Sequence, residues 1–125
     1  MIDSHCHLAD ASFAQDLPAV LARARDAGVL HMICIADDIS EAKRCLQIAR
    51  EHENISATVG IHPHNASGFE LSRDIPILQA LAHEPSCVAI GEIGLDYHYM
   101  RSAKSIQQQA FEAQLSLSRD MHLPA

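Results

Sequence analysis

VLHMICIA, the stretch from Val29 to Ala36, decides the fold because it is a largely apolar run between two segments of helical periodicity. Runs of this kind are typical of strands that are buried in a parallel sheet. Comparable runs recur about every 30 residues along the chain. They are Met1-Ile2, Ile55 to Ile61, Cys87 to Ile90, and a possible start at Leu123.

The segments between these runs are predicted to be helices, because their apolar residues fall at three- and four-residue steps. Gly28 is a natural stop after the first helix. Ser40 is placed as an N-cap of the second, a role that also suits Asp37-Asp38. Pro76 is expected in the first turn of the third. The predicted helices are Phe13 to Ala27, Ile39 to His52, Ile75 to His83 and Ser102 to Arg119.

Alternation at this spacing predicts βα units around a parallel sheet, so the fold class is α/β. Four units fit in 125 residues, and a fifth strand begins at Leu123. A (β/α)8 TIM barrel needs eight units and about 250 residues. Residues 1–125 are therefore predicted to form the N-terminal half of a single TIM barrel, with no second domain. A small self-contained α/β sheet is the alternative, which the abrupt end inside an element disfavours.

The composition limits the classes of function. The chain is 48% hydrophobic and mostly aliphatic, which suits the packing layers of a βα fold. Its net charge of −7 argues against a protein that holds nucleic acid by charge alone, since that binding needs a basic face. An enzyme that meets a phosphodiester through a bound metal ion is still compatible with this charge.

The four cysteines are widely spaced and form no CxxC motif, so we expect small buried residues in a reducing cytosol. The N-terminus does not have the pattern of a signal peptide, because acidic Asp3 and the histidines that follow it interrupt the segment. No apolar run approaches the length of a membrane span. We therefore expect a cytoplasmic protein without membrane contact. The cysteines are Cys6, Cys34, Cys45 and Cys87.

His5 and His7 stand two residues apart at the end of the opening strand. Side chains at i and i+2 of a strand point to the same face, so the two imidazoles can converge on one metal ion. Neutral imidazole is a common ligand of Zn²⁺ and of other divalent cations. A half-buried polar pair is the alternative, and a metal site requires further ligands.

Polar residues also follow the third and fourth strands, at the end where parallel α/β folds place their sites. Pro63 should end the third strand and leave His62 and His64 in a loop. We expect these histidines to have a functional role, and the alternative is that they are two ordinary exposed loop residues. Glu92 directly follows the fourth strand, where a lone carboxylate would be costly to bury. One partner for the Glu92 carboxylate is a metal ion, because His5 and His7 would lie on the same rim of the sheet. The alternative partner is a buried arginine.

Three of these segments resemble the TatD family of metal-dependent deoxyribonucleases, within the metallo-dependent hydrolase superfamily. The matching stretches are IDSHCHL (2–8), VGIHPHNA (59–66) and VAIGEIGLDY (88–97), in the order and spacing of the family. The segment from Arg119 to Pro124 also looks like the family's lead-in to a fifth strand. Ala9 departs from the pattern, since many members have an acidic residue there, but Asp10 follows at once.

The resemblance implies a TIM barrel with up to two divalent ions at its C-terminal rim, without distinguishing Mg, Mn and Zn. His5 and His7 would bind one ion, and Glu92 would bind or bridge both. His62 would act in catalysis at the substrate phosphate. The remaining ligands of the family would lie beyond the last residue of this chain. The residues expected to contact the substrate are His64, Asp96 and Tyr97.

The implied activity is the hydrolysis of phosphodiester bonds, above all in DNA. One alternative keeps the same metal chemistry but acts on a different ester or an amide. Another is a truncated, catalytically inactive half-barrel, which would associate with itself because it exposes two sheet edges and an apolar face. For the full protein we expect DNA or another phosphodiester as partner and no stable protein partner.

Overall fold

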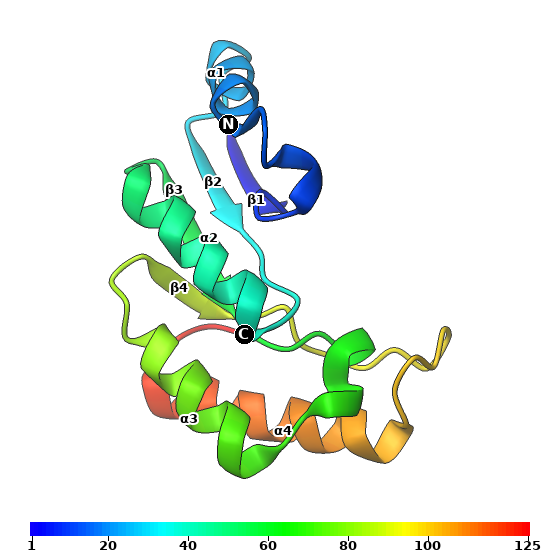
Figure 1. The fold of residues 1–125 in the computed structure, drawn as a ribbon. Helices are drawn as coiled ribbons and strands as arrows, with labels where there is room; N and C mark the ends of the chain where they lie inside the picture. The colour runs from blue at the N-terminus through cyan, green and yellow to red at the C-terminus, as the bar shows by residue number, and fades with distance from the viewer.

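A computed structural model describes residues 1–125 and contains one four-stranded sheet (Figure 1). The strands lie in chain order, β1-β2-β3-β4, and each neighbouring pair is parallel. All four carboxyl ends therefore face the same edge of the sheet. The four predicted runs form these strands, which are β1 (Ile2–Cys6), β2 (His31–Cys34), β3 (Ile55–Val59) and β4 (Cys87–Ile90).

Each strand is followed by an α-helix, which confirms the predicted alternation. α2 lies over the sheet, whereas α3 and α4 pack against each other beside β4 (Figure 1). None of the helices combines the length and the apolar composition that a membrane crossing requires. The helices are α1 (Leu17–Asp26), α2 (Ile39–Glu51), α3 (Leu71–Ala82) and α4 (Lys104–Met121), with two 3₁₀ helices, η1 (Ala11–Phe13) and η2 (Pro63–Gly68).

The starts of the first two helices differ from the prediction because of local capping. The single helix predicted from Phe13 is divided, since Asp10 caps η1 and α1 begins only after it, with Pro18 in its first turn. Proline suits that position because the first turn leaves its N–H groups unpaired in any case. Asp38 caps α2, because its carboxylate accepts a backbone hydrogen bond in the first turn, so the assignment of Ser40 is wrong.

α3 begins at Leu71, about one turn before the predicted start. The Asp74 carboxylate accepts the backbone N–H of Glu70 at 2.8 Å and thereby satisfies a free donor at this helix end. Pro76 consequently lies inside the helix and not in its first turn.

The strand expected at Leu123 is not formed. After α4 the chain runs beside β4, where the Ile90 N–H donates to the Pro124 carbonyl at 2.9 Å. A strand requires a repeated ladder of such bonds, and this segment makes one.

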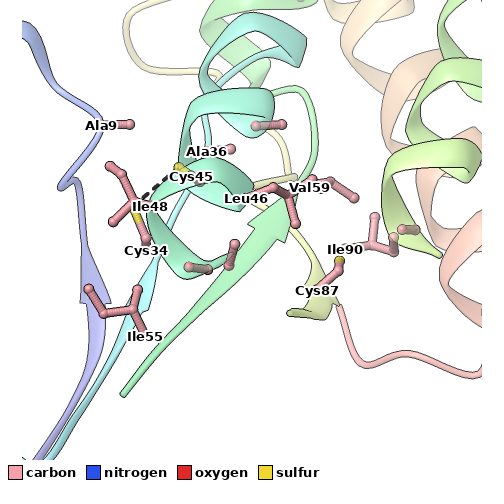
Figure 2. Packing of buried hydrophobic residues seen from close by; sticks show 14 of the residues in the cluster. Ala9, Cys34, Ala36, Cys45, Leu46, Ile48, Ile55, Val59, Cys87 and Ile90 are labelled. Atoms are coloured by element: carbon pink, nitrogen blue, oxygen red, sulfur yellow. Dashed lines mark hydrogen bonds between the residues drawn. The ribbon is translucent and has the colours of Figure 1, made fainter. Parts of the chain in front are cut away.

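The hydrophobic core lies between α2, α3 and one face of the sheet (Figure 2). β2 shows the division between the two faces, because Met32 and Cys34 are buried whereas His31 and Ile33 are only half-buried. α2 turns one continuous face towards the buried side of the sheet. The buried residues of that face are Ala42, Cys45, Leu46, Ile48 and Ala49.

All four cysteines are free. Three of them are buried, as predicted, whereas Cys6 is only half-buried. Cys34 Sγ and Cys45 Sγ lie 3.2 Å apart where α2 packs on β2 (Figure 2). Burial, with a smaller contribution from the Asp3 carboxylate, raises the pKa of Cys6 to about 12. Because the thiolate is the reactive form, Cys6 is a packing residue and not a nucleophile.

Candidate active site at the carboxyl ends of the strands

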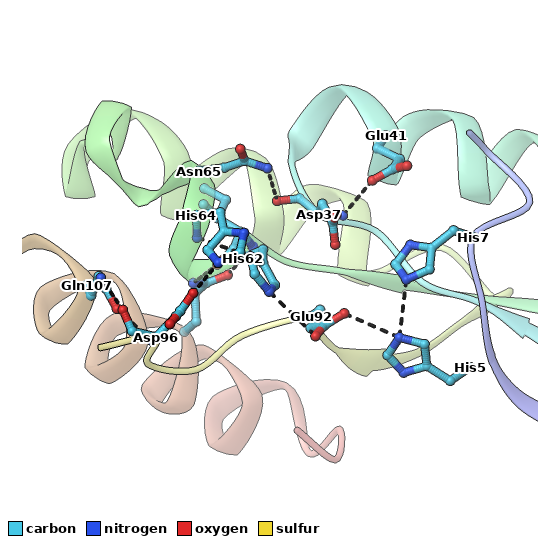
Figure 3. Close-up of polar contacts among 12 residues, drawn as sticks. His5, His7, Asp37, Glu41, His62, His64, Asn65, Glu92, Asp96 and Gln107 are labelled. Carbon is cyan, nitrogen blue, oxygen red and sulfur yellow. Dashed lines mark hydrogen bonds and ion pairs between the residues drawn. The ribbon is translucent and has the colours of Figure 1, made fainter. Parts of the chain in front are cut away.

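The three residues expected to bind metal meet at the carboxyl edge of the sheet (Figure 3). His5 lies in β1, His7 follows that strand, and Glu92 follows β4. The two histidine Nε2 atoms are 3.2 Å apart, and His5 Nε2 lies 3.3 Å from Glu92 Oε2. One ligand atom from each of the three residues lies within 4.8 Å of the other two.

These donors fit a divalent ion in both type and spacing. Two imidazole nitrogens and one carboxylate oxygen are ligands that zinc accepts. Two ligands at about 2.0–2.2 Å from one tetrahedral ion lie roughly 3.4 Å apart. The observed separations of 3.2 and 3.3 Å are close to that value. The His5 side chain is 55% exposed, so the cluster is open to solvent.

His62 stands on the other side of Glu92. Its Nε2 lies 3.6 Å from Glu92 Oε1, so one carboxylate faces His5 with one oxygen and His62 with the other. Pro63 begins η2, which confirms that the third strand ends before the histidines. His62 Nδ1 accepts the backbone N–H of His64 at 3.1 Å. The neutral ring therefore carries its proton on Nε2, the nitrogen that faces Glu92.

His64 pairs through its Nε2 with the Asp96 carboxylate. Asp96 Oδ1 also accepts the backbone N–H groups of His98 and Tyr99, at 2.9 and 3.1 Å. The hydrogen bond with His64, reinforced by these backbone bonds, lowers the pKa of Asp96 to about 2. Asp96 is consequently ionised at neutral pH, and it joins the loop after β4 to η2.

Tyr97 is the one expected substrate residue that the structure does not bring to the histidines. Its ring centre lies 4.8 Å from Lys104 Nζ, at the start of α4. No hydrogen bond or ring contact joins it to His62 or His64. Tyr97 thus lies on the outer part of the loop that Asp96 anchors.

Two buried glutamines of α4 hold the loops after β3 and β4 in place, a role that was not predicted from the sequence. Gln107 accepts the Asp96 N–H at 2.8 Å and donates to the carbonyls of Asp96 and Ser102. Gln114 accepts the Ile61 N–H at 2.7 Å and donates to the Ile61 carbonyl. The two side chains are about two turns apart on one helix face, a pattern that ordinarily indicates core packing.

Asp37 and Glu41 form a second group of possible ligands with His7, again with one atom of each within 4.8 Å of the others. Asp37 Oδ1 is buried without a hydrogen-bond partner. The Asp37 N–H donates to Glu41 Oε2 at 2.7 Å. Asp37 and Asp38 were both expected to cap the helix, and only Asp38 has that role. The signal that could have separated them is the position of Asp37 at the carboxyl end of the second strand.

The fold and this rim define a class of protein: a parallel βα-barrel half with metal-ligand side chains at the carboxyl ends of its strands. A family model narrows the class. The model described as TatD related DNase matches residues 2–125. The chain belongs to the TatD-related DNase family, which confirms the resemblance found in the three motifs.

Curated relatives match nearly the whole chain. A Salmonella typhimurium protein named 3'-5' ssDNA/RNA exonuclease TatD is 37% identical over 124 residues, which are 99% of this chain and 47% of that protein. A Pantoea vagans protein of the same name is 39% identical over 126 residues, with 99% of this chain and 48% of that protein covered. The chain spans about half the length of the curated relatives it matches.

A solved structure gives the same result for the fold. The crystal structure of YjjV, a TatD homologue from Escherichia coli K12, matches with a TM-score of 0.91 and 32% identity. The match covers 99% of this chain and 48% of that one. The four βα units are therefore the first half of a TIM barrel, as predicted.

Proposed function

We propose that the protein is a divalent-metal-dependent hydrolase of phosphodiester bonds in nucleic acid, a TatD-like nuclease, to which residues 1–125 contribute part of the active site. The observation that carries this proposal is the convergence of His5, His7 and Glu92 within 4.8 Å. The position of His62 beside Glu92 supports it. The relatives named as exonucleases of single-stranded DNA and RNA support nucleic acid as the substrate.

His5 and His7 would hold one ion, and Glu92 would contribute its carboxylate to that ion or to both ions of the complete barrel. Bound ions would supply an activated water for attack on phosphorus, and they would offset the charge on the phosphoryl oxygens. Of the candidate ions, the two imidazoles favour zinc or another transition metal over magnesium.

We assign to His62 a hydrogen bond that stabilises negative charge on an oxygen of the substrate phosphate. Its Nδ1 accepts the His64 N–H, so the neutral ring can donate from Nε2 to such an oxygen while it keeps its proton. His64 and Asp96 pair in the adjoining loop and hold this arrangement in place. We propose these two residues, with Tyr97, as substrate contacts.

We also propose that the protein works in the cytoplasm. Its four cysteines are free, and two of them have sulfur atoms 3.2 Å apart without a bond. Thiols so close together suit a reducing compartment. Probing cell fractions with an antibody against the protein tests the location, and recovery outside the cytoplasmic fraction would contradict it.

The activity is tested on protein expressed from its complete reading frame. A single-stranded oligonucleotide and methyl p-nitrophenyl phosphate serve as substrates, with Mg²⁺, Mn²⁺, Zn²⁺ or EDTA added. We expect both to be hydrolysed with a divalent ion and neither in EDTA. p-Nitrophenyl acetate and a p-nitroanilide cover the alternative substrates. Hydrolysis of the ester or the amide alone would replace this function by a different metallo-hydrolase activity.

Self-association of the isolated 125-residue polypeptide is a second candidate, favoured by the open sides of the sheet. β1 and β4 are its outer strands, and Met1, Ile2 and Leu30 are exposed near its amino-terminal edge. Unpaired edges and exposed apolar residues promote pairing with another chain. We expect light scattering to report a dimer or larger species, and a stable monomer would contradict the idea.

A further inference from the structure

The loop between β4 and α4 presents two tyrosines beside the candidate active site. Tyr97 is 42% exposed and Tyr99 is 66% exposed. Arg101 Cζ lies 5.9 Å from the centre of the Tyr99 ring, and Lys104 Nζ lies 4.8 Å from that of Tyr97. Each exposed ring is thus accompanied by a cation. We propose that this tyrosine pair is a stacking platform for the bases of single-stranded nucleic acid, whose phosphates Arg101 and Lys104 contact.

Tyr99 is fixed relative to the candidate active site. Its backbone N–H donates to Asp96 Oδ1 at 3.1 Å, and the other Asp96 oxygen pairs with His64. The Tyr99 and His64 ring centres are 5.8 Å apart in an edge-to-face arrangement, and those of His64 and His62 are 4.5 Å apart. A continuous row of rings therefore runs from Tyr99 to His62, which faces Glu92. A strand stacked on Tyr99 would have a phosphate near this rim.

The outer part of this loop and the start of α4 carry positive charge that suits a nucleic acid backbone, although the loop also holds Glu92 and Asp96 and the chain as a whole is acidic. The chain has a net charge of −7, yet residues 97–111 contain no aspartate or glutamate. Arg101 and Lys104 form no ion pair with a carboxylate, whereas Arg50 and Arg73 do. The two cations of the loop are thus free to meet phosphate, and the aromatic rings supply the contact that charge alone cannot.

The platform selects single strands because stacking needs an exposed base face. In a duplex each base is covered by its neighbours, whereas a single strand can place a base on an aromatic side chain. Such stacking tolerates every base, since all four have an aromatic face. This inference rests on the proposed function for its substrate class, and it adds the residues that bind the bases.

Binding is tested on the complete protein in EDTA, so that cleavage is absent, with an oligonucleotide that carries the fluorescent base 2-aminopurine. Stacking on Tyr99 quenches this base. We expect Tyr99→Ala to abolish the quenching at one position of the strand and to raise Kd about 10-fold or more. Tyr99→Phe, which keeps the ring, should bind within about 2-fold of the wild type. Leu30→Ala is the control, because Leu30 is exposed at the opposite edge of the sheet.

A second variant tests the cations without removing a ring. Replacing Arg101 and Lys104 together by glutamine should lower the slope of log Kd against log salt by about 1 to 1.5 for a single strand. An unchanged slope would overturn their assignment to phosphate. A duplex bound as tightly as the single strand, or quenching retained in a folded Tyr99→Ala variant, would overturn the platform.

Hydrolysis of methyl p-nitrophenyl phosphate separates this inference from the proposed function, because that diester carries no base. Tyr99→Ala should therefore lose about 10-fold more activity on the oligonucleotide than on this diester. If the wild type hydrolyses the small diester with none of the divalent ions, the proposed function is wrong. The quenching result still tests the stacking platform in that case. If Tyr99→Ala hydrolyses both substrates like the wild type, the platform fails alone.

Discussion

His5 Nε2 lies 3.3 Å from Glu92 Oε2, although His5 belongs to β1 and Glu92 follows β4, the two outer strands of the sheet. In a flat sheet, β1 and β4 would be about 14 Å apart, three strand spacings of roughly 4.8 Å. The contact therefore requires a sheet curved in the manner of a barrel wall. The side chains of His5 and Glu92 point toward each other across its edge (Figure 3). This curvature makes a common site out of motifs that lie far apart in the sequence.

The first prediction concerns Glu92, whose carboxylate lies between His5 and His62. Glu92→Gln keeps the shape but removes the charge that would hold an ion, so kcat/KM on an oligonucleotide should fall about 100-fold or more. His31→Ala is the control, because the half-buried His31 side chain hydrogen-bonds Ser56 of the neighbouring strand β3 at 2.9 Å. Equal activity in the two variants would show that Glu92 has no special role.

The second prediction concerns Gln107, which is 1% exposed and makes three hydrogen bonds to the loop after β4. Gln107→Leu leaves these backbone groups without partners, and it should lower the free energy of unfolding by about 2–3 kcal/mol. Urea denaturation of the variant measures the loss. Gln108→Leu, on the exposed side of the same helix, should change stability by less than about 0.5 kcal/mol. Similar losses in the two variants would indicate that the loop contacts contribute nothing.

The third prediction concerns Gly60, where the ends of β3 and β4 approach closely. A Cβ on Gly60 would lie 2.6 Å from the Gly91 carbonyl carbon, so backbone would have to move. Gly60→Ala should cost about 1–3 kcal/mol of unfolding free energy and displace the adjoining active-site loops. Gly68→Ala is the matched control, since its Cβ would meet nothing within 4 Å. Thermal melts of the two variants compare them, and a Gly60→Ala protein as stable as the control would contradict the close packing.

The fourth prediction concerns the pH dependence of Asp96, whose pKa of about 2 lies below its ordinary value of 3.8. A carboxyl group with a lowered pKa stabilises the folded state above its ordinary pKa, and it loses that contribution as the pH falls through the lowered one. The wild type should therefore melt above Asp96→Asn between pH 5 and about 7, by a margin that shrinks from about pH 4 and is lost at about pH 2. A margin that stays constant down to pH 2 would exclude ionised Asp96 as its source.

The sequence alone determined the elements and the candidate ligands. Apolar runs and helical spacing are local properties, so the four strands and the order of the helices could be predicted from them. His5, His7, His62 and Glu92 could be placed on one rim, because parallel strands bring their carboxyl ends to the same edge. Helix starts were less predictable, since capping by Asp38 depends on the hydrogen bond that the folded turn selects.

Only the tertiary structure decided which side chains meet. The grouping of Asp37 and Glu41 with His7 joins segments that the sequence keeps separate. The spacing of Gln114 in its helix is typical of a residue that packs in the core, yet its side chain hydrogen-bonds the backbone of Ile61, far away in the sequence. Such contacts depend on the curvature of the sheet and on the position of α4 against the loops. Both are set by packing among distant residues, whereas periodicity along a sequence records only which face of an element is buried.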